Sequence, residues 1–292
     1  MASKTGLAGS SMIVSSDPER VEAETGDPVS HEQGTEQQRT TTFGSELPAS
    51  TLLGVWAHPD DESYLSAALM SRVAGAGGRV VVATATRGEQ GGPGDDSRRV
   101  AELRERELRM ALHHLGVGEL RVLGHADGRC SSEDAARATR TITDLIDEVR
   151  PDVIVTFGPD GITGHPDHRA VSGWTTAAAD ALGHDGLLYA TMTDGFARRH
   201  AELHERLGIR MGGDPVFVAV AELALHVVPT RDERARKARA LRAHASQTTP
   251  LIELIGPDAF DAWWVDEFFR RPTVAEQAAA SSRLGATPWL VS

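Results

Sequence analysis

Short apolar runs alternate with helical patterns along this chain, and that alternation limits its fold more than any other feature. The runs are rich in Val, Leu and other apolar residues, as is typical of buried strands. They are TLLGVWA (51–57), RVVVATAT (79–86), LRVLG (120–124), DVIVTFG (152–158) and GLLYAT (186–191). Strands that alternate with helices are usually parallel and joined by right-handed crossovers. The pattern therefore predicts a mostly parallel sheet.

The stretches between these runs have helical spacing. They are 62–74, 98–116, 132–149 and 169–182. Gly116 and Pro151 are typical helix stops. We predict an α/β fold, a Rossmann-like three-layer sandwich whose active site lies at the carboxyl edge of the strands. No G-x-G-x-x-G follows the first run, so the fold alone does not indicate a nucleotide.

The pattern is less regular after residue 195. VFVAVAELALHVVP (216–229) predicts one or two strands, and TRDERARKARALRAH (230–244) predicts a charged amphipathic helix. The first 48 residues show neither the helical nor the strand spacing of apolar residues. Such a polar stretch buries too little apolar surface to offset the entropy lost when it is ordered. We therefore predict a disordered, low-complexity tail at 1–48 and one folded α/β domain at 49–292.

Composition limits which partners, disulfides and membrane segments the chain can have. The net charge of −12 argues against a nucleic-acid partner and is compatible with a neutral or cationic small substrate. The single cysteine, Cys130, excludes an intramolecular disulfide. No apolar stretch approaches the ~20 residues of a membrane span, and the N-terminus lacks a secretory apolar region. We expect a cytoplasmic protein with no transmembrane segment, and a homo-oligomer is compatible with the sequence.

Two polar motifs directly follow strand-like runs. AHPDDE (57–62) follows the first run, and GHPDH (164–168) follows DVIVTFG after a short loop. Because parallel strands end at one sheet edge, the two motifs should lie together. Adjacent carboxylates repel unless water or a cation offsets their charge. Zinc binds His nitrogen and Asp oxygen, commonly through three protein ligands plus water, and a further carboxylate can serve as general base.

These paired motifs resemble the signature of the LmbE/PIG-L-like zinc N-deacetylases, which include GlcNAc-phosphatidylinositol and mycothiol-pathway deacetylases. The resemblance spans about residues 52–247. It implies a Zn²⁺ cofactor, although Fe²⁺ or another divalent ion suits the same ligands. It implies removal of an acetyl or other acyl group from an amide nitrogen, with a small amino-sugar substrate of the N-acetylglucosamine type.

The resemblance also implies roles for individual residues. The implied metal ligands are His58, Asp61 and His168, and the implied general base is Asp60. His165 would polarise the acyl oxygen or protonate the leaving amine. The remaining implied roles are substrate binding by Arg104 and Asp127, orientation of a histidine by Asp167, and a C-terminal motif near the site at 237–247.

Other interpretations fit parts of the same sequence. AHPDDE also suits a helix N-terminus, where acids favour the positive end of the dipole, and Glu62 could equally be a capping residue. An amidase of a thiol conjugate or lipid-linked substrate, a phosphate-ester hydrolase and a non-catalytic binding domain are alternative functions. Thr163 stands where the family often has an aromatic residue. We expect Trp263 and Trp264 to pack the C-terminal region, with an aromatic wall for substrate as the alternative.

Overall fold

The computed structural model describes residues 50–92, 96–212 and 215–282. The predicted tail at 1–48 lies outside the described residues, so its disorder and the domain boundary at 49 stay predictions. No helix among the described residues is long and apolar enough to cross a membrane.

Eight strands of the described chain form one mixed sheet in the order β3-β2-β1-β4-β5-β8-β7, and β6 pairs with β5. The first five strands are parallel, as predicted, whereas β8 runs antiparallel to both β5 and β7. The strands are β1 (Thr51–Trp56), β2 (Arg79–Thr84), β3 (Glu119–Val122), β4 (Val153–Phe157), β5 (Leu187–Thr193), β6 (Phe217–Val218), β7 (Leu225–Val227) and β8 (Glu267–Arg270).

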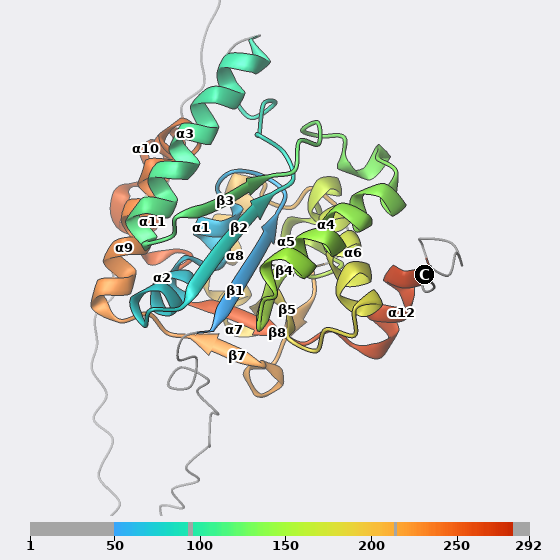
Figure 1. Cartoon of the computed structure of the whole chain (residues 1–292). Coiled ribbons are helices and arrows are strands. Elements are labelled where there is room, and N and C mark those ends of the chain that lie inside the picture. Colours follow the sequence, from blue (N-terminus) through green and yellow to red (C-terminus); the bar gives the residue numbers. More distant parts are fainter. Residues whose placement is uncertain (1–49, 93–95, 213–214, 283–292) are drawn as a thin grey trace, which may run out of the picture. The chain divides into compact units, whose positions relative to one another are not determined.

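Helices cover both faces of the sheet, which gives the predicted three layers (Figure 1). On one face α2 (Ala67–Gly75), α3 (Ser97–Leu115) and α9 (Arg231–Ala243) pack together, and on the other α4 (Ala135–Val149), α6 (Pro166–Ala181) and α12 (Val274–Ser282) do so. The shorter helices are α1 (Asp61–Leu65), α5 (Gly161–Gly164), α7 (Asp194–Arg199), α8 (Ala201–Leu207), α10 (Ala245–Ile255), α11 (Pro257–Ala262), and the 3-10 turns η2 (Cys130–Ser132) and η3 (Val220–Glu222).

Local chemistry explains where several helices begin and end. Gly116 ends α3 in the left-handed conformation (φ 79°), as its sequence position predicts. The side chain of Asp134 caps α4 by accepting hydrogen bonds from the amides of Ala136 and Arg137, so this helix starts three residues later than predicted. Thr230 and Glu233 form a capping box at the start of α9.

The predicted helix 62–74 is divided into two. Ser66 has a non-helical backbone (φ −146°) between α1 and α2, and its hydroxyl donates to the carbonyl of Glu62 at 3.1 Å. The predicted helix 169–182 instead begins at Pro166, inside the GHPDH motif, because proline suits the first turn and His165 caps it.

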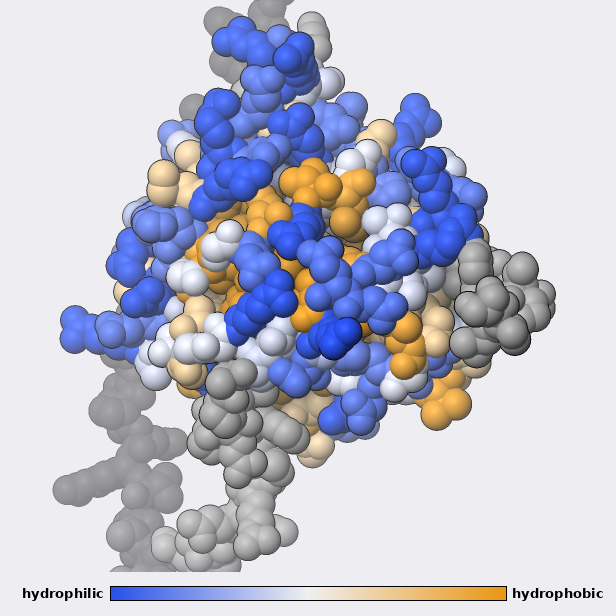
Figure 2. Space-filling view, viewed as in Figure 1, coloured by the Kyte–Doolittle hydropathy of each residue, from blue (hydrophilic) through white to orange (hydrophobic). Residues whose placement is uncertain are grey.

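The core is continuous through the sheet and both helical layers. Its largest fully buried side chains include Trp56, Phe157, Tyr189 and Phe269, which belong to β1, β4, β5 and β8. Hydrophilic residues cover most of the face seen in Figure 2, with hydrophobic residues gathered toward its middle. This packing fixes the strand ends that carry the two polar motifs.

Candidate metal centre and active site

Both motifs form helix N-termini at the same edge of the sheet. β1 leads through His58, Pro59 and Asp60 directly into α1, and neighbouring β4 leads through α5 into α6, which begins at Pro166. The helix-terminus interpretation of AHPDDE is therefore right about local structure. It does not exclude a site, because two such termini from adjacent strands bring their side chains together.

Three of the predicted residues converge on one point. Nδ1 of His58 lies 3.2 Å from Nε2 of His168 and 3.6 Å from Oδ2 of Asp61, and Nε2 of His168 lies 3.3 Å from Oδ1 of Asp61. All three residues are buried. Two imidazole nitrogens and one carboxylate, each of whose oxygens lies near one of them, suit a divalent cation that keeps one position open.

The outer atoms of the two histidines support this fit. Nδ1 of His168 lies 3.0 Å from the Gly161 carbonyl oxygen, so that nitrogen carries the proton and the Nε2 lone pair faces the convergence point. Nε2 of His58 lies 3.1 Å from Oδ1 of Asp127 and 3.3 Å from Oδ2 of Asp167, which leaves its Nδ1 lone pair facing the same point. The donor set therefore fits a metal ion.

The pKa shifts of the three converging residues also support a cation at this point. Burial lowers the pKa of His58, but the hydrogen bonds that its ring donates to the carboxylates of Asp127, Asp167 and Asp61 raise it overall, well above its usual value. Burial lowers the pKa of His168 to about 4. Burial raises the pKa of Asp61, but the two histidines lower it overall. The carboxylates thus favour positive charge at this point, which a divalent cation would supply.

His165 lies beside this cluster rather than within it. Its ring centroid is 4.8 Å from that of His58 and 4.9 Å from that of His168, and its Nδ1 accepts a hydrogen bond from the Asp167 amide at 3.1 Å. One ring nitrogen of His165 also lies within 4.8 Å of nitrogens of His58 and His168, so these three form an alternative ligand set. The ring is half-buried and borders the cavity.

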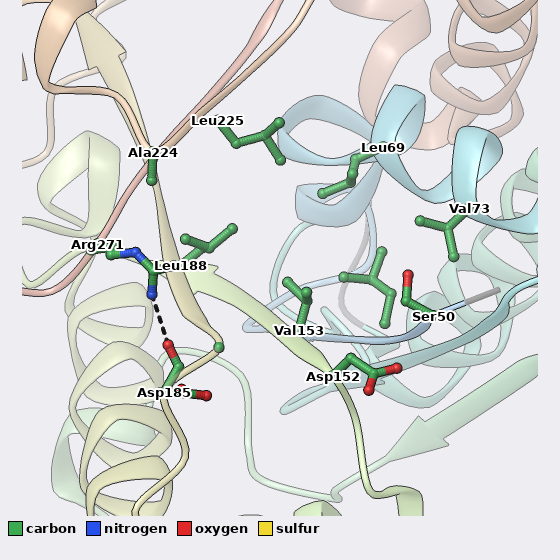
Figure 3. A pocket seen from close by; sticks show the side chains of 12 residues that line it. Ser50, Leu69, Val73, Asp152, Val153, Asp185, Leu188, Ala224, Leu225 and Arg271 are labelled. Carbon is green, nitrogen blue, oxygen red and sulfur yellow. Dashed lines mark hydrogen bonds between the residues drawn. The ribbon is translucent and has the colours of Figure 1, made fainter. Parts of the chain in front are cut away.

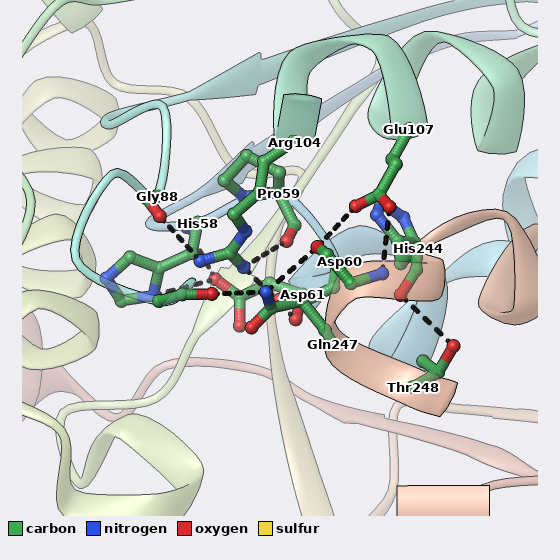
Figure 4. A network of polar contacts seen from close by, with 12 residues as sticks. His58, Pro59, Asp60, Asp61, Gly88, Arg104, Glu107, His244, Gln247 and Thr248 are labelled. Atoms are coloured by element: carbon green, nitrogen blue, oxygen red, sulfur yellow. Dashed lines mark hydrogen bonds and ion pairs between the residues drawn. The ribbon is translucent and has the colours of Figure 1, made fainter. Parts of the chain in front are cut away.

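Asp60 is held in an unusual backbone conformation, with φ 126°. Its amide donates to Oε2 of Glu62 at 3.0 Å, and Nη2 of Arg104 lies 3.3 Å from its Oδ2 (Figure 4). Burial raises the pKa of Asp60 to about 6, although Arg104 opposes this shift. Its carboxyl is therefore close to a proton-accepting range near neutral pH.

Arg104 is buried beneath Asp60. Its guanidinium donates to the Pro59 carbonyl at 2.6 Å and to the Gly88 carbonyl at 2.9 Å. A Cβ at Gly88 or Gly91 would collide with this guanidinium, so the glycine loop leaves room for it. Arg104 also borders the cavity over the metal ligands, and its predicted substrate contact stays a prediction.

Asp127 and Asp167 both contact His58. Asp127 also accepts a hydrogen bond from the Gln90 amide at 2.8 Å, and the fully buried Asp167 accepts from the amides of Gly128 and Cys130. This is the position that an orienting carboxylate occupies. Asp127 also borders the cavity, and its predicted substrate contact stays a prediction.

A second group of buried polar side chains lies next to Asp60, and the sequence analysis did not predict its contacts. Glu62 lies 2.9 Å from Nε2 of the fully buried His244 and accepts a 2.5 Å hydrogen bond from Ser63. Gln247 donates to the carbonyl of Gly91. His244 and Gln247 belong to the C-terminal motif at 237–247. The similarity of this motif to that of the known family was the one feature of the sequence that placed these two residues near the site. This motif therefore contacts the start of α1 and the glycine loop next to Asp60, and Figure 4 shows His244 and Gln247 near Asp60.

A cavity of about 550 Å³ opens over this cluster, with Asp60, Asp61, His165 and His168 in its lining. Another cavity, of about 230 Å³, lies where β1, β4 and β5 begin (Figure 3). Its carboxylates, Asp152 and Asp185, have no histidine or cysteine beside them in its lining. The chemistry therefore belongs to the larger cavity.

The fold and site define an α/β protein with a cluster of metal-ligating type at the strand ends. Residues 53–179 match the family model described as PIG-L, GlcNAc-PI de-N-acetylase. A Catenulispora acidiphila protein named 1D-myo-inositol 2-acetamido-2-deoxy-alpha-D-glucopyranoside deacetylase 2 is 33% identical over 251 residues, covering 70% of this chain and 82% of that protein. A Rhodococcus jostii deacetylase of the same name, without the final number, is 33% identical over 239 residues, covering 68% and 82%. The chain belongs to the PIG-L family and is an enzyme of the N-deacetylase class.

Solved structures share the fold. The conserved protein TT1542 from Thermus thermophilus matches with a TM-score of 0.56 and 21% identity, covering 77% of this chain and 95% of that one. N,N'-diacetylchitobiose deacetylase from Pyrococcus horikoshii matches with a TM-score of 0.54 and 18% identity, covering 79% and 85%. At these identities the likeness concerns the fold, and it agrees with the predicted architecture.

Proposed function

We propose that this protein is a metal-dependent hydrolase that removes an acetyl group from the amide nitrogen of an N-acetylglucosamine-type substrate. The observation that carries the proposal is the convergence of His58, Asp61 and His168 beside the carboxylate of Asp60. The amino-sugar substrates named for the relatives supply the substrate class.

His58, Asp61 and His168 would hold the metal, which we expect to be Zn²⁺, with Fe²⁺ as the alternative. A bound divalent cation lowers the pKa of water and polarises a carbonyl oxygen. One structural relative is described as the zinc-inhibited form of teicoplanin deacetylase Orf2, so the identity of the metal has to be measured for each protein.

The chain's own groups then handle protons. The Asp60 carboxylate accepts a proton from the attacking water, while the water oxygen adds to the acyl carbon. His165 faces the same cavity, where it stabilises the acyl oxygen or donates a proton to the departing nitrogen. The carbon–nitrogen bond breaks, and the products are a free amine and acetate. Arg104 and Glu62 keep Asp60 in its strained position.

The first experiment measures release of free amine from N-acetylglucosamine and from its inositol glycoside. It compares the wild type with Asp60→Asn, and metal content is measured in both. We expect a loss of about 10²–10⁴-fold in kcat with the metal retained. Asp144→Asn, an exposed aspartate on α4, is the matched control.

Equal turnover by wild type and a metal-replete Asp60→Asn variant would contradict Asp60 as the base. Turnover of a thiol conjugate in place of both sugars would favour the amidase alternative on the same site. The predicted cytoplasmic location and homo-oligomer stay predictions.

A further inference from the structure

A buried ion pair lies next to the proposed general base Asp60, outside the cavity over the metal ligands. Glu62 on α1 is 1% exposed, and His244, at the junction of α9 and α10, is fully buried. Neither is among the described residues that line this cavity. The two side chains can therefore influence the reaction only through other residues, and not by contact with a substrate.

The carboxylate of Glu62 links His244 to the backbone of Asp60. Oε1 of Glu62 lies 2.9 Å from Nε2 of His244, and its Oε2 accepts a hydrogen bond from the Asp60 amide at 3.0 Å. A non-glycine residue with φ 126° persists only when its surroundings hold it. The position of the Glu62 carboxylate thus decides how firmly the Asp60 backbone is held, and with it the Asp60 side chain.

Glu62 needs a cation in order to stay in place. A buried carboxylate is costly unless hydrogen bonds and an opposite charge offset its desolvation. In the part of the chain that the structure describes, His244 is the one residue that forms an ion pair with Glu62. Burial lowers the pKa of His244, but Glu62 raises it overall, which favours the protonated ring beside the carboxylate.

The turn between α9 and α10 fixes His244 itself. The His244 carbonyl accepts hydrogen bonds from the amides of Gln247 and Thr248, both at 2.9 Å. Ser246, in the same turn, donates through its amide and its hydroxyl to the carboxylate of Glu107 on α3, at 2.8 and 2.6 Å. The ring of His244 therefore meets Glu62 from a backbone that is anchored to a second helix.

We propose that His244 is a positioning residue for amide hydrolysis, which acts on Asp60 through Glu62. The imidazole ring holds the Glu62 carboxylate, and that carboxylate holds the Asp60 amide, so that the Asp60 side chain stays aimed at the attacking water. His244 donates no proton to the reacting atoms and accepts none from them. This inference rests on the proposed hydrolase function and adds a residue to it.

Kinetics of His244→Gln provide the first test. Glutamine is uncharged, so it leaves the buried Glu62 without its cation. We expect kcat in the amine-release assay to fall about 10–100-fold, because a small displacement of a catalytic group is enough for such a loss. KM and metal content should change little, since His244 does not border the cavity. His226→Gln is the matched control, because it breaks a histidine–carboxylate pair on β7, with Asp266 at 3.1 Å, and should keep the wild-type kcat.

A double variant shows whether His244 acts through Glu62. If it does, Glu62→Ala and Glu62→Ala/His244→Gln should have the same kcat, because the link to Asp60 is already broken in the first of them. Losses that multiply would mean that the two residues act independently, which contradicts the proposal. The double variant has no unpaired carboxylate at position 62, so this comparison remains informative if His244→Gln does not fold.

Amide hydrogen exchange measures the positioning without any substrate. In zinc-loaded His244→Gln, the Asp60 amide should exchange at least about tenfold faster than in the wild type, because its acceptor is no longer fixed. The amides of Ala68 and Leu69, which donate to Glu267 at 2.7 and 2.9 Å, are internal controls and should exchange as before. NMR spectroscopy of the full chain follows the three amides separately.

Unchanged kcat and unchanged Asp60 exchange in a folded His244→Gln protein would overturn the proposal. Equally faster exchange at Asp60, Ala68 and Leu69 would also overturn it, because it would show a general loss of stability. Absence of amine release by the metal-loaded wild type would overturn the hydrolase function instead, and the exchange comparison would still decide whether His244 positions Asp60.

Discussion

At the scale of single residues, Asp60 shows how strain is retained at this site. A non-glycine residue at φ 126° costs about 1–3 kcal/mol and persists only when its surroundings hold it. The Glu62 carboxylate accepts a hydrogen bond from the Asp60 amide on one side. On the other side, the Arg104 guanidinium donates to the Pro59 carbonyl and forms an ion pair with the Asp60 carboxylate. The strained backbone is therefore held at both ends, which aims this carboxylate into the cavity.

Arg104→Lys tests whether the arginine positions Asp60 or binds substrate. A lysine ammonium cannot reproduce the planar guanidinium, which donates to the carbonyls of Gly88 and Pro59 and also pairs with the Asp60 carboxylate. We expect kcat to fall about 10–100-fold with KM little changed and metal content retained. Steady-state kinetics on the amine-release assay provide the measurement. A rise in KM with unchanged kcat would instead indicate the substrate contact predicted from sequence.

At the scale of elements, β8 and α9 hold the site through a buried ion pair. Glu267 on β8 accepts hydrogen bonds from the amides of Ala68 and Leu69 at the start of α2, and from Lys237 on α9. Lys237 also donates to the carbonyl of Tyr64 on α1 at 2.7 Å. One carboxylate and one ammonium thus join β8, α9, α1 and the start of α2.

Lys237→Met should destabilise the fold by about 3–5 kcal/mol, because it leaves the fully buried carboxylate of Glu267 without its cation. Urea denaturation followed by circular dichroism measures the change. Arg98→Met removes one partner of an exposed pair on α3 and should leave the urea midpoint almost unchanged. A Lys237→Met protein as stable as the wild type would show that the pair adds nothing.

At the scale of the whole molecule, the predicted metal joins two loops that are about a hundred residues apart in sequence. A ligand that binds only the folded chain stabilises it by about 2.7 kcal/mol at a hundred times Kd. We therefore expect Zn²⁺ to raise the Tm by about 5–10 °C, and a chelator to reverse this shift and abolish amide hydrolysis. Differential scanning calorimetry with metal analysis measures both effects.

His168→Ala should remove most of this Zn²⁺-dependent rise in Tm, whereas His113→Ala, an exposed histidine on α3, should retain it. An equal rise in both variants would mean that Zn²⁺ binds elsewhere on the chain.

The sequence by itself determined the parallel part of the sheet and the meeting of its two motifs. Apolar runs of strand length, each followed by histidines and acids, are local patterns, and parallel strand ends must share one edge. Strand order alone left His165 and His168 both open as ligands, and the resemblance to a known family implied His58, Asp61 and His168. The same local logic predicted the stop of α3 at Gly116.

Only the tertiary structure decided the position of β8 and the burial of Arg104 and His244, because the residues that pair with them are distant in sequence. β8 contains Glu267 and Arg270, two charges that disfavour a buried strand until Lys237 and Glu276 pair with them. Its antiparallel place between β5 and β7 was therefore not predicted. Arg104 and His244 likewise resemble surface residues on charged helices, and become buried supports of Asp60 and Glu62 only when α3 and α9 pack over the loop. A local pattern cannot encode such pairings, because burial of a charge is favourable only when its partner is already in position.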